Sequence, residues 1–135
     1  SFVMDVAAMD LKVEAPAKSA EVGGKMAYTP YEVDRAPEFF KGDERNFLEE
    51  WVYVYLRYPQ VAVDMGIQGV VNVEFVVEAD GSVTNVRVTR SVDEDLDREA
   101  VRVVSASPKW RPAIKNGEKV RVKYSLPIEF RLKKR

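Results

Sequence analysis

The chain contains neither cysteine nor histidine. Without thiolates and imidazoles it lacks the usual ligands for zinc, haem and iron–sulfur clusters, and it lacks the commonest general base and thiol nucleophile. Disulfide bonds are excluded too, so the sequence carries no record of a redox compartment. We therefore expect no metal and no cofactor.

Other signatures are missing as well. No apolar run approaches the roughly 20 residues needed to span a bilayer, and there is no phosphate-binding glycine loop or G-x-S-x-G nucleophile turn. The acidic run at 93–97 lacks the ligand spacing of a calcium loop and suits the first turn of a helix. A net charge of −1 offers no broad attraction for nucleic acid. These absences predict a protein that is not an enzyme.

Three regions differ in composition. Residues 1–27 are predicted to be a linker or an irregular segment, because 12–25 are rich in alanine, glycine, proline and charge. Residues 28–41, with two prolines and several aromatics, are predicted to form an extended strap on the surface. Residues 42–135 hold the regular patterns of a folded domain. Because the chain starts at Ser1 with no leader, we expect it to be part of a longer protein.

The patterns in 42–135 predict helices and strands in a definite order. A first helix follows the cap Asp43 and places Phe47, Leu48, Trp51, Tyr55 and Leu56 on one face. The remaining predicted elements are a short helix at 59–65, a strand at 69–77, a return strand at 82–90 after the Asp80-Gly81 turn, a helix at 93–108, and a strand at 120–132. The expected fold is α+β with two layers, a three-stranded antiparallel sheet with helices packed on one face and the other face wet.

The last strand contains a proline. Apolar and polar residues alternate along 120–132, yet Pro127 has no N–H and would break a ladder in a strand paired on both sides. We therefore expect this strand at a sheet edge, with Pro127 and the other odd-numbered residues directing their backbone groups outward. Proline and lysine there could simply protect the edge from aggregation. Alternatively, the edge is kept open for a peptide that adds as a further strand.

The two tryptophans have simpler interpretations. Trp51 lies on the apolar face of the first helix and is expected in the core. Trp110 lies between Pro108 and Pro112, where it either anchors that loop to the core or contacts a partner.

Residues 57–132 resemble the C-terminal domain of the TonB family, in the form found in Bacteroidetes. The resemblance rests on motifs in a fixed order: Tyr58-Pro59, Gly66-Ile67-x-Gly69-x-Val71-x-Val73-x-Phe75, Asp80-Gly81-x-Val83, Trp110-x-Pro112 and the strand VKYSLPIEF at 122–130. It implies a fold of the TolA/TonB C-terminal type. It also implies a periplasmic domain tethered to the inner membrane, where an upstream anchor engages a proton-driven motor complex.

The resemblance also implies a binding site. Such domains grip the TonB-box peptide of an outer-membrane transporter, which joins the sheet as a strand beside the last strand. Carried onto this chain, the peptide-binding residues are Val120, Arg121, Val122, Lys123, Tyr124 and Ser125, with Tyr58 and Pro59 nearby. Two alternatives stay open, namely a soluble appendage of a membrane-bound sensor or metallopeptidase, and a module that forms a homodimer.

Overall fold

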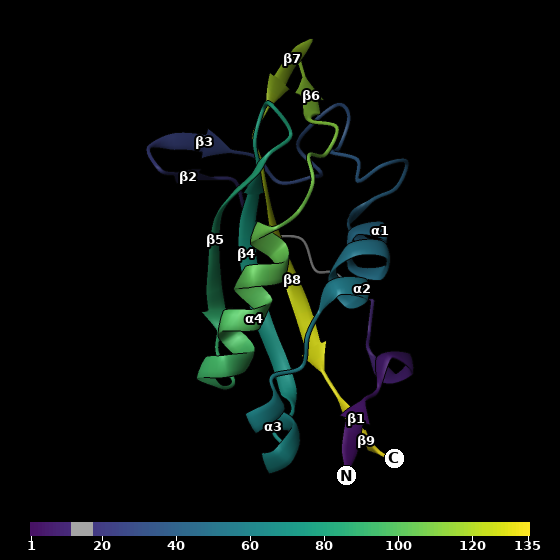
Figure 1. Ribbon diagram of the computed structural model, residues 1–135. Coiled ribbons are helices and arrows are strands. Elements are labelled where there is room, and N and C mark those ends of the chain that lie inside the picture. The colour runs from purple at the N-terminus through teal and green to yellow at the C-terminus, as the bar shows by residue number, and fades with distance from the viewer. Residues whose placement is uncertain (12–17) are drawn as a thin grey trace.

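A three-stranded antiparallel sheet forms the centre of the computed structural model, which describes residues 1–11 and 18–135. Its strands are arranged in the order β5-β4-β8 (Figure 1). They span Val83–Arg90, Gly69–Val77 and Val122–Phe130, respectively. The long strand β8 pairs along the whole length of β4, from Gly69 opposite Phe130 to Val77 opposite Val122. The α+β architecture and the edge position of the last strand are thus as the sequence predicts.

The helices cover one face of this sheet (Figure 1). They are α1 (Glu44–Phe47), the π-helical turn η2 (Leu48–Val52), α2 (Tyr53–Tyr55), α3 (Gln60–Met65) and α4 (Glu94–Ser105). Asp43 and Asp93 cap α1 and α4 by accepting hydrogen bonds from backbone N–H groups of the first turn. Gly66 ends α3 in the left-handed conformation, with φ of 66°. Every helix among the described residues is too short or too polar to span a membrane.

The first helix buries Phe47, Leu48 and Leu56 as predicted, but the prediction is wrong for Trp51 and Tyr55. Phe47, Leu48, Val52 and Leu56 are essentially inaccessible, whereas Tyr55 is 52% exposed and Trp51 is half-buried. The π-helical turn causes this difference, because hydrogen bonds from residue i to i+5 add one residue to that turn. The step from Phe47 to Val52 is therefore five residues, so a regular helical period places Trp51 and Tyr55 on the buried face where the structure has Val52.

The core lies between these helices and the apolar face of the sheet. Phe75 is fully buried at the centre of β4, and its ring lies 5.6 Å from that of Tyr124 and 5.7 Å from that of Phe47. Trp110 is 3% exposed and packs on Phe75 and Tyr124, so it anchors its loop in the core. The opposite sheet face is not uniformly wet as predicted, since Val76 is 1% exposed there.

Residues 28–41, called the strap below, are more than a surface covering. Phe39 is fully buried and its ring packs on Phe47 and Trp110. Backbone bridges hold the strap at Tyr28 with Val122, Arg35 with Ile114, and Glu38 with Arg111. The prediction of a strap on the domain surface therefore missed a core aromatic.

The segment before the strap also contains regular structure. It forms β1 (Phe2–Met4), the 3₁₀ turn η1 (Val6–Ala8) and the hairpin of β2 (Ala20–Val22) and β3 (Lys25–Ala27). The expectation of irregular structure across 12–25 is thus wrong for β2 and the start of β3, while residues 12–17 lie outside the described residues. Strand β1 pairs with β9 (Leu132–Lys134), which brings the two ends of the chain together (Figure 1).

The predicted last strand is divided into three. Glu118–Val120 form β7, which pairs with β6 (Ala113–Lys115) around the Asn116-Gly117 turn. Strand β8 begins only at Val122, and β9 continues after Arg131. Val120 therefore belongs to a separate hairpin, and only Val122–Phe130 pair with β4.

Candidate functional site

The outer edge of β8 shows which backbone groups face away from the sheet. The Lys123 N–H donates to the Tyr28 carbonyl at 2.8 Å, and the Arg121 carbonyl accepts from the Tyr28 N–H at 3.0 Å. The Glu129 N–H donates outward to the Tyr53 hydroxyl at 3.2 Å. The backbone N–H and C=O groups of odd-numbered residues in β8 thus face away from β4, as the sequence predicts. Pro127, which has no N–H, is one of these residues. No ladder bond to β4 is lost.

The upper end of this edge is already occupied. Tyr28 forms a single parallel bridge with Val122, using the outward groups of Arg121 and Lys123. Pairing stops there because Pro30, which would provide the next donor, has no N–H. The sequence predicts that the outward N–H and C=O groups of Arg121 and Lys123 are available to a partner. This prediction is wrong for the Arg121 carbonyl and the Lys123 N–H, because both hydrogen-bond to Tyr28.

The middle of the edge carries no outward hydrogen bond from the described residues. Among the described residues, no group hydrogen-bonds to the outward N–H or C=O of Ser125 or to the carbonyls of Lys123 and Pro127. The lower end closes again at Glu129, where the Tyr53 hydroxyl contacts both the Glu129 N–H and the Asp10 carbonyl. Burial raises the pKa of Tyr53 to about 12, so this hydroxyl stays protonated at neutral pH.

The Arg121 side chain joins the sheet to the N-terminal hairpin. Its guanidinium donates to both carboxylate oxygens of Glu78 at 2.6 and 3.0 Å, and also to the carbonyls of Val22 and Lys25. Hydrogen bonding from Arg121 lowers the pKa of Glu78. This side chain is 12% exposed, so it holds the hairpin in place rather than presenting a charge to solvent.

The other predicted residues of β8 divide between its two faces. Val122 and Tyr124 are fully buried, so their side chains belong to the core. The Tyr124 hydroxyl has no hydrogen-bond partner among the described residues, and burial raises its pKa. Lys123 and Ser125 are half-buried on the opposite face. A partner at this edge would therefore meet the backbone and these two side chains.

Tyr58 and Pro59 lie at the other end of β8. The Tyr58 ring packs edge-on against Phe130 at 5.4 Å, and its hydroxyl donates to the Ile67 carbonyl. Burial raises the pKa of Tyr58 to about 12. Because five residues of strand separate Ser125 from Phe130, at about 3.4 Å each, the structure does not bring this pair beside 120–125. Pro59 serves as the N-cap residue of α3.

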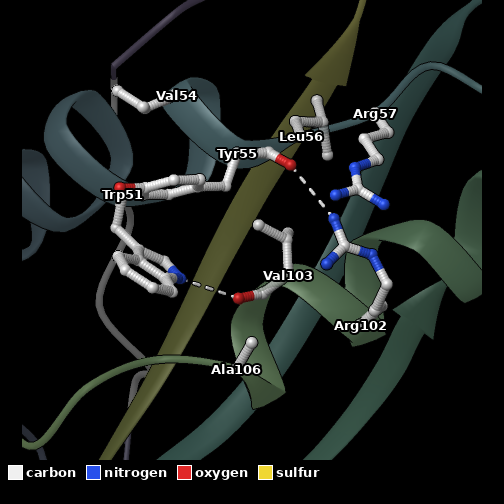
Figure 2. A pocket seen from close by; sticks show the side chains of 8 residues that line it. All are labelled: Trp51, Val54, Tyr55, Leu56, Arg57, Arg102, Val103 and Ala106. Carbon is white, nitrogen blue, oxygen red and sulfur yellow. Dashed lines mark hydrogen bonds between the residues drawn. The ribbon is translucent and has the colours of Figure 1, made fainter.

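A pocket of about 330 Å³ between α2 and α4 is a second candidate site (Figure 2). Trp51 donates its indole N–H to the Val103 carbonyl at 2.9 Å, and Arg102 donates to the Tyr55 carbonyl at 3.0 Å. Arg102 also pairs with Glu99, which is 8% exposed and accepts from the Arg57 N–H. The sequence analysis missed Glu99, although a carboxylate on the apolar stripe of a helix is a recognisable signal. These contacts join the two helices and present no pair of nucleophile and base.

Within the described part of the chain, no cluster of three acidic side chains is arranged to hold a metal ion. The candidate site is the outer edge of β8.

Residues 54–132 match the family model described as Gram-negative bacterial TonB protein C-terminal. The chain belongs to the TonB C-terminal family. It is 38% identical over 79 residues to Protein TonB of Xanthomonas campestris, covering 56% of this chain and 34% of that protein. It is also 38% identical over 78 residues to Protein TonB of Helicobacter pylori, covering 57% of this chain and 26% of that protein.

A solved structure agrees on the fold. The solution structure of the C-terminal domain of Helicobacter pylori TonB has a TM-score of 0.51 and 28% identity, covering 72% of this chain and 91% of that domain. Among curated relatives, in contrast, the chain spans about a third of the Xanthomonas TonB and about a quarter of the Helicobacter TonB. The TonB family match includes all of β8 but not the strap, so the residue that closes the upper edge lies outside it.

Proposed function

We propose that this TonB-family domain binds the N-terminal TonB-box peptide of outer-membrane transporters, which adds to the outer edge of β8 as a further strand. The observation that carries the proposal is the direction of the odd-numbered backbone groups, with those of Ser125 unused among the described residues. Unpaired groups on a strand edge recruit another strand, and side chains beside that edge supply selectivity.

The proposal includes the wider role of the family. The full protein would couple the proton motive force at the inner membrane to transport at the outer membrane, with this domain in the periplasm. An anchor upstream of residue 1 would engage the proton-driven motor complex. A pull along that tether would then reach the transporter through the peptide. Because the curated relatives are about three to four times longer than the matched segments, there is room for such an anchor.

Strand addition suits a coupler that must release and reload. A net contribution of about 0.5–1.5 kcal/mol per hydrogen bond over a few bonds, less the cost of association, gives an affinity in about the micromolar range. Such a contact holds during a pull and dissociates afterwards. It needs no catalytic group.

The test uses synthetic 12-residue peptides that tile the N-terminal plug segments of outer-membrane transporters from the same genome. Fluorescence anisotropy with the 135-residue chain should find at least one peptide that binds at micromolar concentration, about −8 kcal/mol. The control is the same peptide with N-methyl groups on alternate residues, which cannot donate in a β-ladder. Equal binding of the N-methylated peptides, or no binding by any peptide at about 1 mM, would contradict the proposal.

A further inference from the structure

We propose, on the basis of the function proposed above, that the partner strand pairs with β8 only between Lys123 and Pro127 and leaves Tyr28 in place. The outward backbone groups of β8 are not equally available along the strand. Intramolecular hydrogen bonds to Tyr28 and Tyr53 use the backbone groups at its two ends. The backbone groups between them include more acceptors than donors. The register of the partner strand follows from these boundaries.

Tyr28 sets the upper boundary. It uses the Arg121 carbonyl and the Lys123 N–H, and the strap then turns away from β8. The Thr29 N–H donates to the Glu32 carboxylate and the Glu32 N–H to the Thr29 carbonyl, which fixes that turn. Thr29 is 4% exposed, and the Lys115 ammonium lies 5.2 Å from the centre of the Tyr28 ring. Side-chain contacts therefore support the single bridge between Tyr28 and Val122.

Pro127 and Glu129 set the lower boundary. Pro127 can accept but cannot donate, and the Glu129 N–H is already bonded to the Tyr53 hydroxyl. Between these boundaries, in a window from Lys123 to Pro127, the groups that no described residue hydrogen-bonds are one donor, the Ser125 N–H, and three acceptors, the carbonyls of Lys123, Ser125 and Pro127. A partner strand must accordingly provide N–H groups at alternate residues, so a proline at those positions would not fit.

A polar hollow lies beside this window on the sheet face away from the helices. Its volume is about 330 Å³, and it is lined by Val70, Asn72, Arg90, Ser125, Pro127, Glu129 and Asp10. Directly paired residues in a sheet share a face, so the partner residue opposite Ser125 would direct its side chain over this hollow. Because the lining offers both donors and acceptors, the partner is an extended peptide with a polar side chain at that position.

A disulfide that holds the strap beside β8, and that can be reduced, distinguishes this register from one in which the peptide displaces Tyr28. Tyr28 and Val122 are bridge partners on adjacent backbone segments, so we choose Tyr28→Cys with Val122→Cys for a disulfide, and the chain has no other cysteine. The probe is the tightest-binding transporter peptide from the tiled set. The oxidised and reduced forms should bind it within about threefold of each other. If oxidation abolishes binding and reduction restores it, the strap must leave and the proposed register is overturned.

A backbone variant tests the window itself. Ser125→Pro removes its only donor without taking a ladder bond from β4, and it should weaken binding about tenfold. Ser125→Thr keeps both the N–H and the hydroxyl and should restore binding. Unfolding curves of both variants show whether the fold is intact. If wild-type chain binds the peptide and folded Ser125→Pro binds it equally well, the register is wrong; if wild-type chain binds no peptide, the proposed function fails first.

A leucine scan of the peptide tests the hollow. One polar position should lose about fivefold or more in affinity when replaced by leucine, because leucine leaves the polar lining without partners. Tolerance of leucine at every polar position would overturn the assignment of that side chain to the hollow.

Discussion

The two faces of β4 differ in what holds them. On the helix side, Val71, Val73, Phe75 and Val77 are fully buried. On the other side, Asn72 and Glu74 are half-buried while Val76 is 1% exposed. The face that the sequence predicts to be solvent-exposed is therefore buried near Val76 and partly exposed near Asn72 and Glu74.

Two ion pairs on that second face make the contrast clear. Arg121 and Glu78 are 12% and 22% exposed, and Arg121 also bonds two carbonyls of the N-terminal hairpin. Arg87 and Glu74 form a pair of similar length, yet Arg87 is 66% exposed. Because solvent screens exposed charges, the same chemistry should stabilise the fold at one end of the face and contribute little at the other.

The largest effect on stability is expected at the centre of the helix-covered face of β4. Phe75→Ala would remove a ring that packs on Phe47, Tyr124 and Trp110, and it should lower the free energy of unfolding by about 3–5 kcal/mol. Urea unfolding followed by tryptophan fluorescence measures this. Phe75→Leu, which fills part of the space, should cost less. Equal losses for the two variants would mean that filled volume does not set the cost at this site.

A smaller loss is expected for Arg121→Ala. It would leave the Glu78 carboxylate with Thr84 and remove the donor from the Val22 and Lys25 carbonyls. Charged hydrogen bonds of this kind contribute about 1.5–3 kcal/mol. Hydrogen exchange should become faster in β2 and β3, the strands of the hairpin that Arg121 holds.

Arg121→Lys is the matched variant. It keeps the charge, but its ammonium has three donors and cannot make the four hydrogen bonds of the guanidinium, so its stability should lie between those of the wild type and Arg121→Ala. Unchanged exchange in the hairpin would show that Arg121 does not hold it.

Sequence patterns predict the fold best where local signals are strong. The capping Asp93, the stop at Gly66 and the alternation along β4 each fix an element through contacts within a few residues. Elements that depend on distant partners carry no such period. Strand β1 exists because β9 is beside it, and Phe39 is buried because Phe47 and Trp110 meet it.

The candidate site divides in the same way. Pro127 was enough to predict which backbone groups of β8 point outward, because a proline inside a ladder would cost a hydrogen bond. The occupation of Arg121 and Lys123 by Tyr28 was not predictable, since one bridge between residues far apart in the chain leaves no pattern in either segment. The family match likewise begins after the strap.

The pH dependence of stability tests the buried end of the second face. Arg121 lowers the pKa of Glu78 in the folded state, below the value near 4.3 that is typical of an unfolded chain. A lowered folded pKa means that the contribution is complete above about pH 4.3 and is lost as the pH falls through the folded value. Glu78→Gln should therefore make the loss of stability between about pH 5 and 2 shallower. Parallel curves for the variant and the wild type would contradict this.

The smallest effect is expected for the exposed pair. Arg87 reaches one oxygen of Glu74 through two nitrogens at 3.0 and 3.2 Å, but most of its side chain is in water. Removing it should change the free energy of unfolding by less than about 0.5 kcal/mol, because an exposed pair gains little over the hydration that each charge already has. A double-mutant cycle of Arg87→Ala and Glu74→Ala isolates the pair, and 1 M salt should leave its coupling energy near zero. A loss as large as that of Arg121→Ala would mean that exposure does not separate the two ends of this face. The contrast between the ion pairs would then need another cause, such as rigidity of the strands that carry them.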